Sequence, residues 1–355
     1  MIRDKKYRKY IDVVSQIISD VGEEKDKRKI LISGISGMLG TVIADILLCM
    51  NDNYGYKFVV YGLGRRIDYA QERFAIYEKR ADFKFIACDI NEGIPEIEGV
   101  NYIIHAASNT HPVDYSEDPI GTIASNVIGT NNLLKYAVKH NCIRFVFISS
   151  VEIYGENRGD IETFDEAYCG YIDCNTLRAG YPESKRTGEA LCQAYGKKYN
   201  MNFVIPRLCR TYGPTMSLRD SKAIAQFIKN AARKEDIVLK SEGKQLYSYI
   251  DVFQAAYAIL YIMFKGQNGE AYNIASDLGN WYMKELAEMA ADTVGRKVVF
   301  DLPDESEKAG FSTATKAILD NRKLKKLGWS EILDCKEIFR YTIEVIRNRL
   351  SEGEV

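Results

Sequence analysis

The sequence has 355 residues, of which 46% are hydrophobic and 27% charged, proportions that are ordinary for a soluble globular protein. Its 48 Lys and Arg residues and 49 Asp and Glu residues give a formal net charge of −1, which argues against a general nucleic-acid-binding protein because such proteins carry a basic field. The longest apolar run, residues 255–264, is too short to span a bilayer, so no membrane partner is expected.

Cysteine and histidine spacing predicts no metal site. The eight cysteines include no pair with CxxC spacing, and the three histidines form no ligand cluster. Free thiols in a chain without a recognisable export signal predict a reducing, cytoplasmic location.

The first 28 residues predict an amphipathic helical extension. Tyr10, Val14, Ile17, Ile18 and Val21 recur at helical spacing. We expect this helix to pack on the body of the protein or on a second subunit.

Residues 29–213 alternate short β-branched runs with helix-length segments such as 126–140. The expected strands are 29–33, 57–61, 83–87, 101–105 and 144–149. Buried strands that alternate with helices predict an α/β protein with a doubly wound, Rossmann-type parallel sheet.

Residues 214–355 predict a smaller, mainly substrate-binding lobe. The expected elements are a helix at 223–233, strands at 237–239 and 247–250, a helix at 252–264 and a strand at 271–275. We expect the part from about 252 to 276 to return to the Rossmann domain, and the lobe to close over that domain, since binding sites often lie in such clefts.

A glycine-rich loop, "SGISGMLG", follows the first expected strand. Gly34 permits a tight turn, Gly37 lets the backbone approach a pyrophosphate, and Gly40 lets the next helix pack on the sheet. The helix N-terminus then offers free N–H groups to the phosphates. The loop therefore predicts a dinucleotide site, with Ser36, Met38 and Leu39 as further contacts.

The end of the second strand bears on the choice of cofactor. An acidic residue that binds the ribose 2′-hydroxyl is expected there, but the chain has Tyr61 and Gly62, followed by Arg65 and Arg66. A missing acid and two added cations favour NADP, with NAD possible. The alternative is that both arginines are merely solvated.

Two later strand ends complete the predicted cofactor site. Asp89 and Ile90 follow the third strand, where an adenine ring would lie. Ala106, Ala107 and Ser108 follow the fourth, where small residues can pass under the nicotinamide ribose.

The chain resembles the extended short-chain dehydrogenase/reductase family of nucleotide-sugar epimerases, dehydratases and decarboxylases. The resemblance covers residues 29–329 and depends on the glycine loop together with "NVIGTNNLL" (126–134), "SSVEIYG" (149–155), "YPESK" (181–185) and "TYGP" (211–214). Tyr181 and Lys185 are four residues apart, so on a helix they share one face.

The resemblance implies roles for five side chains. Tyr181, with Lys185 beside it, would lose its proton more readily and exchange a proton with a sugar hydroxyl during hydride transfer. Ser150 would hydrogen-bond the same oxygen, and Lys185 would also hold the nicotinamide ribose. Ser149 would contact the cofactor, and Asn126 would have a structural and water-relay role.

The same resemblance leaves the reaction open. Relatives that decarboxylate or dehydrate carry a glutamate that acts as a base or contacts substrate at the place of Glu152, although a structural carboxylate is the alternative. Val151 cannot donate the proton that an aspartic acid gives in many dehydratases, so that type of dehydration is less expected.

Two residues depart from the family's pattern around the substrate. Arg210 replaces an asparagine that contacts the nucleotide diphosphate, and Tyr247 stands where an arginine usually grips it. We expect Arg210 to take over the phosphate contact, since guanidinium presents a fork of donors. Arg178, in a loop-like segment before the tyrosine, and Asn109 are further expected substrate contacts.

The leading hypothesis is an NAD(P)-dependent oxidoreductase that acts on a sugar linked to a nucleotide diphosphate, working as a homodimer. One alternative is a net reductase that uses NADPH to convert a nucleotide-linked ketose to an alditol. Another is a nucleotide-sugar decarboxylase that uses Glu152. A non-catalytic dinucleotide sensor is a different class, which the intact Ser–Tyr–Lys set argues against.

Overall fold

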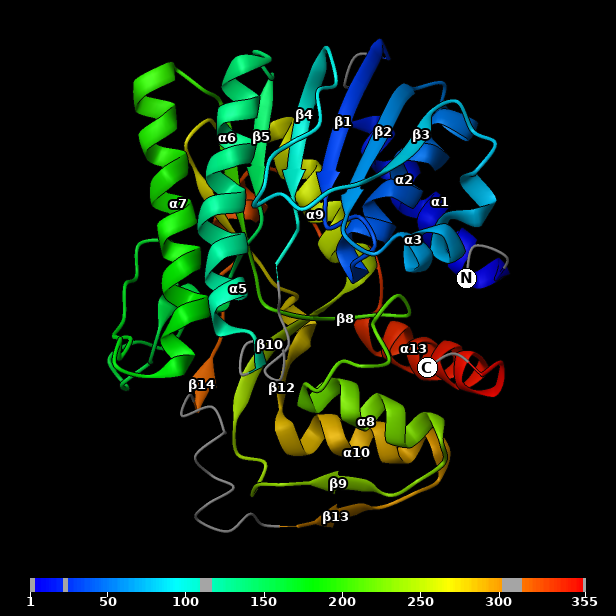
Figure 1. Ribbon diagram of the computed structural model, residues 1–355. Helices are drawn as coiled ribbons and strands as arrows, with labels where there is room; N and C mark the ends of the chain where they lie inside the picture. Colours follow the sequence, from blue (N-terminus) through cyan, green and yellow to red (C-terminus); the bar gives the residue numbers. More distant parts are fainter. Residues whose placement is uncertain (1–3, 22–24, 109–116, 302–314, 354–355) are drawn as a thin grey trace.

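The computed structural model describes residues 4–21, 25–108, 117–301 and 315–353. Figure 1 shows a large twisted sheet with helices on both faces and a smaller lobe beyond the carboxyl ends of its strands. Ligands of open α/β sheets bind at that end of the strands, so the two lobes meet where a site is expected.

The large sheet is entirely parallel, and the predicted doubly wound α/β class is confirmed. Its strand order is β3-β2-β1-β4-β5-β7-β11, with β6 paired to β7. The order reverses between β1 and β4, which is the switch point of a Rossmann-type sheet. Its strands are β1 (Lys27–Ser33), β2 (Lys57–Gly64), β3 (Phe83–Ala87), β4 (Val100–His105), β5 (Arg144–Phe147), β6 (Ser149–Ser150), β7 (Phe203–Leu208) and β11 (Ala271–Ile274).

Alternate side chains of the strands enter two separate cores, because successive residues of a strand point to opposite faces. On β1, Ile30 and Ile32 join one core, and Leu31 joins the other. Helices cover both faces, so the strands read as continuous apolar runs. One face is covered by α2 (Met38–Tyr54) and α9 (Val252–Lys265), and the other by α5 (Pro119–Ala124), the π-helix η2 (Ser125–Gly129), α6 (Thr130–Lys139) and α7 (Gly180–Tyr199).

Two expected elements are divided in the structure. The strand predicted at 144–149 is two strands, β5 and β6, separated at Ile148. The helix predicted at 126–140 begins with the π-turn η2 before α6. Such π-turns are frequent at functional sites, and both irregularities lie next to predicted catalytic residues.

The N-terminal helix α1 (Lys5–Asp20) packs on the protein's own α2 and α9. Asp4 caps it by accepting hydrogen bonds from two backbone N–H groups, those of Lys6 (2.8 Å) and Tyr7 (2.9 Å). The hydroxyl of Tyr7 donates to the buried carboxylate of Asp45 at 2.6 Å. Of the two partners expected for this helix, the body of the protein is the one observed.

The smaller lobe is built around a four-stranded sheet of β8 (Arg210–Tyr212), β10 (Leu246–Asp251), β12 (Asn280–Tyr282) and β14 (Lys316–Ala317). A second, two-stranded sheet pairs β9 (Ile237–Leu239) with β13 (Val298–Phe300). The lobe's helices are α8 (Ala223–Ala232), α10 (Met283–Val294), α12 (Arg322–Lys326) and α13 (Cys335–Ser351). Strand β11 follows α9 and pairs with β7, so the chain passes from the smaller lobe back into the large sheet.

Shorter elements join these parts. They are α3 (Ile67–Phe74), η1 (Ala75–Tyr77), η3 (Val151–Tyr154), η4 (Leu177–Ala179) and η5 (Asp277–Gly279). No helix among the described residues is long and apolar enough to cross a membrane. Within the same residues, no cluster of His, Cys, Asp and Glu is arranged to bind a metal ion.

Candidate active site

The glycine loop joins β1 to α2 with no space for side chains at its glycines. Gly34 has φ +71°, and a Cβ there would lie 2.7 Å from the backbone of Ala107. A Cβ on Gly40 would lie 2.5 Å from the carbonyl oxygen of Gly34. Gly37 forms the N-cap of α2, and no described side chain caps that end, so its N–H groups are left for an anionic ligand.

A cavity of about 580 Å³ extends from this loop along the carboxyl ends of the strands. It is lined by most of the residues predicted to contact the cofactor. These are Gly34, Ser36, Gly37, Met38, Leu39, Gly40, Arg65, Arg66, Asp89, Ile90, Ala106, Ala107 and Ser108. The glycine cradle, the open helix end and the residues that line the cavity fit a dinucleotide.

The smaller lobe contributes residues to this cavity that sequence reasoning missed. Thr215, Arg219 and Lys222 line it from the segment after β8, and Tyr69 lines it from α3. The sequence does contain Arg219 and Lys222 shortly after "TYGP" (211–214), which could have suggested a phosphate contact. Only the docking of the smaller lobe brings these cations to the cavity at the glycine loop. Thr215 donates a hydrogen bond to the carbonyl of Met38 at 3.0 Å, which fixes that docking.

Arg65 and Arg66 follow β2 and are exposed at the edge of the cavity. The guanidinium of Arg66 lies 4.6 Å from the centre of the Tyr69 ring. Cation–π stacking of this kind restrains an exposed arginine. The arginines therefore stand at the end of β2 where the ribose of a dinucleotide is expected.

The predicted Ser–Tyr–Lys set comes together at the start of α7. Tyr181 and Lys185 are buried, one turn apart, and Ser150 lies at the end of β6. The Lys185 ammonium donates to the carbonyl oxygen of Ile148 at 2.9 Å, at the break between β5 and β6. The interrupted strand thus holds the lysine.

The surroundings of Tyr181 act on its pKa in both directions. Burial raises the pKa of Tyr181 to about 12, the hydrogen bond with Ser150 lowers it, and the carboxylate of Glu152 raises it. Burial also lowers the pKa of Lys185 to about 8, although Glu189 opposes this. Burial is the largest of these influences, so it opposes formation of the phenolate in the protein without cofactor.

Asn126 connects the cofactor cavity to the catalytic helix. Its amide nitrogen donates to the Ser184 hydroxyl at 2.9 Å, and its amide oxygen accepts from Ser108 at 2.9 Å. Ser184 in turn donates to the carbonyl of Tyr181 at 2.9 Å. The π-turn η2 places Asn126 at this point, fully buried.

Four predicted cofactor contacts are not among the described residues that line the cavity: Asn126, Ser149, Tyr181 and Lys185. For Ser149 the expectation needs correction. Its side chain is buried, and its hydroxyl donates to Glu189 at 2.6 Å. Strand alternation explains this, since neighbouring residues of a strand point to opposite sides.

The predicted substrate residues meet around Glu152. The guanidinium of Arg178 lies 3.9 Å from one Glu152 oxygen, and that of Arg210 lies 4.0 Å from the other. The Arg210 guanidinium also stacks on Tyr247, 3.6 Å from the ring centre. Nη1 of Arg210 is buried and has no hydrogen-bond partner within the described parts of the chain. Asn109 lies outside the described residues.

A dinucleotide cradle beside a Ser–Tyr–Lys set defines a dehydrogenase/reductase of the short-chain type. The chain belongs to the NAD dependent epimerase/dehydratase family, whose model matches residues 30–275. The predicted family membership is thereby confirmed, as is the prediction that the protein is an enzyme of this family.

Named proteins of similar sequence support this family membership. UDP-glucuronic acid decarboxylase 4 of Arabidopsis thaliana is 29% identical over 330 residues, which cover 91% of this chain and 70% of the relative. UDP-glucuronic acid decarboxylase 5 of the same plant is 30% identical over 281 residues, covering 78% and 79%.

Solved structures share the fold. A dTDP-glucose 4,6-dehydratase from Streptomyces venezuelae, with NAD bound, has a TM-score of 0.77 and 22% identity, covering 92% of this chain and 99% of that one. UDP-glucuronic acid 4-epimerase from Bacillus cereus, in complex with UDP-glucuronic acid and NAD, has a TM-score of 0.76 and 19% identity, covering 90% and 99%.

Proposed function

We propose that the protein decarboxylates a nucleotide-linked hexuronate. The observation that carries the proposal is the cluster of Arg178, Arg210 and Glu152 beside the Ser–Tyr–Lys set. Two cations against one anion leave one positive charge, and the buried Nη1 of Arg210 still needs an acceptor. A substrate carboxylate supplies both the missing charge and the missing acceptor. The names of the relatives support the same chemistry.

The chain's own residues would divide the work as follows. Bound nicotinamide would supply a hydride acceptor and donor. Tyr181, hydrogen-bonded to Ser150, would take the proton of the sugar hydroxyl and later return one. Lys185 would stabilise the phenolate, which burial otherwise disfavours. Arg178 and Arg210 would hold the carboxylate next to the oxidised carbon.

Oxidation of the sugar makes the loss of carbon dioxide feasible. A ketone two carbons from a carboxylate accepts the electron pair of the breaking C–C bond as an enolate, which then takes up a proton. Glu152 is within reach of both arginines and two residues from Ser150, so it would orient the arginines and act on this proton. Val151 is apolar and buried, which does not suit acid-assisted dehydration.

The test is a comparison of three candidate substrates with the purified protein. UDP-glucuronate labelled with ¹³C at the carboxylate should release labelled carbon dioxide and give a UDP-pentose by NMR. UDP-glucose and dTDP-glucose should give neither product. Conversion of a neutral sugar without any reaction of the uronate would refute the proposal.

A second candidate, a net NADPH-dependent reductase of a nucleotide-linked ketose, is favoured by the two arginines at the end of β2. Arg65 and Arg66 line the cofactor cavity there, and β2 ends without an acid. We therefore propose NADP over NAD as the preferred cofactor. Either cofactor could serve the decarboxylation, in which the nicotinamide is reduced and reoxidised within one catalytic cycle. Retained nucleotide extracted from the protein indicates recycling, whereas net NADPH consumption with a ketose indicates the reductase.

We also propose a homodimer and a reducing cytoplasmic location. Ile120 on α5 is 80% exposed and Leu177 before α7 is 74% exposed, with Ile123 and Ile128 also exposed nearby. A second copy would cover these apolar side chains, which light scattering can test. All eight cysteines lie in described parts of the chain as free thiols, which suits a reducing compartment.

A further inference from the structure

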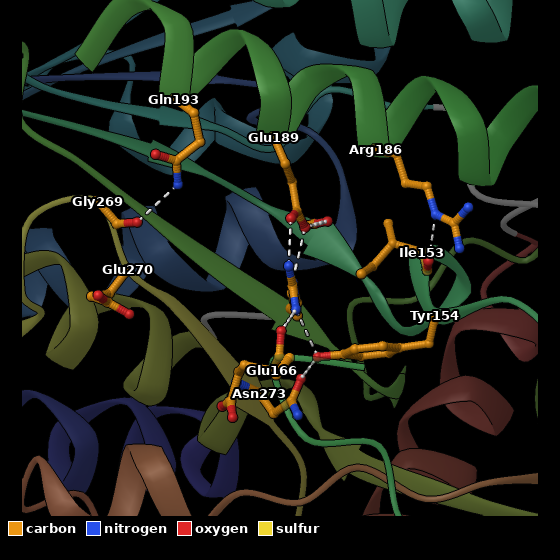
Figure 2. A network of polar contacts seen from close by, with 12 residues as sticks. Ile153, Tyr154, Glu166, Arg186, Glu189, Gln193, Gly269, Glu270 and Asn273 are labelled. Atoms are coloured by element: carbon orange, nitrogen blue, oxygen red, sulfur yellow. Dashed lines mark hydrogen bonds and ion pairs between the residues drawn. The ribbon is translucent and has the colours of Figure 1, made fainter. Parts of the chain in front are cut away.

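Helix α7 presents a charged residue behind the catalytic set. Tyr181, Lys185 and Glu189 are spaced by four residues and therefore lie on one face of the helix. Figure 2 shows Arg186, Glu189 and Gln193 projecting from α7 toward the strands beneath it. Continuing the four-residue spacing of Tyr181 and Lys185 by one helical turn leads to Glu189, so the sequence could have predicted that Glu189 lies on the catalytic face.

Glu189 forms a paired contact with Arg207 of β7. Nε of Arg207 donates to Oε1 at 3.0 Å and Nη2 donates to Oε2 at 2.7 Å, and both side chains are only 12% exposed. The same Oε1 accepts the hydroxyl of Ser149 at 2.6 Å. Ser149 opposes Arg207 in the β6–β7 register and directly precedes Ser150. One carboxylate thus joins the catalytic helix to the strand that carries the catalytic serine.

Arg207 extends the connection away from the helix. Its Nη1 donates to the Tyr154 hydroxyl at 3.0 Å and to the carbonyl of Glu166 at 2.8 Å. Tyr154 donates to the amide oxygen of Asn273 at 2.6 Å, as Figure 2 shows. Asn273 donates to the carbonyl of Asp320 at 3.1 Å, in the segment between β14 and α12. The pair therefore links α7, β6, β7 and β11 to a segment of the smaller lobe.

Glu189 lies one helical turn beyond Lys185 on the same face of α7. Other groups that act on the Lys185 ammonium are His105 on β4, the Phe147 ring, whose centre is 5.0 Å away, and Cys192 on the same helix. Burial lowers the pKa of His105 to about 3 and raises that of Cys192, so both are neutral at pH 7. The carboxylate of Glu189 raises the pKa of Lys185 against the effect of burial.

We propose that Glu189 and Arg207 are positioning residues of the active site. The pair fixes β6 against α7, which holds Ser150 next to Tyr181, and the carboxylate supplies the counter-charge for the Lys185 ammonium. The part that concerns catalysis rests on the proposed function, whereas the charge coupling to Lys185 does not.

The test measures Lys185 directly, in full-length protein labelled with ¹³C at lysine Cε. The Lys185 resonance is assigned by its loss in Lys185→Met, and its titration midpoint is compared among wild type, Glu189→Gln and Arg207→Gln. Glu189→Gln removes the anion and leaves the Arg207 cation, so the midpoint should fall by about one pH unit or more. Arg207→Gln leaves the anion unpaired, so the midpoint should rise.

Two further variants separate position from charge. Arg207→Lys keeps the charge but loses the planar fork, so the midpoint should stay near wild type while kcat falls about tenfold or more. Gln193→Ala is the matched control, because Gln193 lies one turn beyond Glu189 and, among the described residues, donates only to the carbonyl of Gly269 at 3.0 Å. It should change neither the midpoint nor kcat.

Opposite shifts for Glu189→Gln and Arg207→Gln support the inference, and in the enzyme assay the basic limb of the kcat profile should move in the same two directions. If the Lys185 midpoint shifts in the same direction in both variants, or in neither, the inference is overturned. A kcat of Arg207→Lys equal to that of wild type also overturns it. If Arg207→Gln does not fold, Glu189→Gln and Arg207→Lys decide the matter. A wild type that turns over no nucleotide sugar refutes the proposed function, while the NMR midpoints still decide the charge coupling.

Discussion

Replacement of Arg210 tests the proposed substrate directly. Arg210 stacks on Tyr247 and points its guanidinium toward Glu152, 4.0 Å away, with Nη1 buried and unpartnered within the described residues. A substrate carboxylate would accept a fork of two charge-assisted bonds from it, each contributing about 1.5–3 kcal/mol. Loss of about 3 kcal/mol or more corresponds to a change of ~100-fold, at 1.4 kcal/mol for each factor of ten.

Arg210→Asn should therefore raise the KM for UDP-glucuronate by ~100-fold, and Arg210→Lys by about tenfold because it keeps the charge without the fork. The matched control is Arg158→Asn. Arg158 also stacks on a tyrosine, 4.2 Å from the ring centre of Tyr171, and lies 3.4 Å from Glu156, but its side chain is 61% exposed. The control should leave KM unchanged.

Calorimetry with UDP and with UDP-glucuronate identifies the contacted group. If Arg210 binds the carboxylate, Arg210→Asn weakens UDP-glucuronate and leaves UDP unchanged. Equal weakening of both ligands would place Arg210 on the diphosphate, as the sequence alone suggested, and would refute the carboxylate assignment. Unchanged affinity for both would show that Arg210 serves only Glu152 and Tyr247.

Three further outcomes are expected. Tyr181→Phe keeps the ring packing and removes the proton carrier, so kcat should fall by ~10² or more with an unchanged cofactor Kd; near wild-type turnover would contradict its role. Replacing Arg65 and Arg66 with alanine should weaken NADPH about tenfold or more in a fluorescence titration and leave NADH nearly unchanged, whereas equal loss would show that neither reads a 2′-phosphate. Burial raises the pKa of Asp45 from 3.8 to about 6, so the folded state binds its proton more tightly than the unfolded state and stability falls as pH rises through that range. Asp45→Asn should reduce the fall of Tm with pH in scanning calorimetry. Part of the fall should remain, because burial also raises the pKa of Asp251. An unchanged dependence of Tm on pH in Asp45→Asn would show that Asp45 does not cause the fall.

Much of the cofactor site follows from local sequence. Gly34 has φ +71°, and a Cβ on Gly40 would lie 2.5 Å from the carbonyl oxygen of Gly34, so both positions favour glycine because of the local course of the chain. Tyr181 and Lys185 share a helix face because of their spacing alone. Alternating strands and helices likewise fix the sheet type, because a buried parallel sheet needs apolar strands and covering helices.

Other features depend on contacts between distant parts of the chain. Burial raises the pKa of Tyr181, and burial is set by everything that packs around the ring. Arg219 and Lys222 reach the cofactor cavity only because the smaller lobe docks on the glycine loop. Arg210 lies against Tyr247 because β8 pairs with β10.

The sequence by itself thus determined the dinucleotide cradle, the face that carries Tyr181 and Lys185, and the class of fold, since each depends on steric demands and periodicities within a few consecutive residues. The tertiary structure alone decided the burial of Tyr181, the ion pair between Glu189 and Arg207, and the group of arginines around Glu152. Desolvation and the approach of charges from separate elements depend on distances in space, and no local pattern of residues encodes those distances.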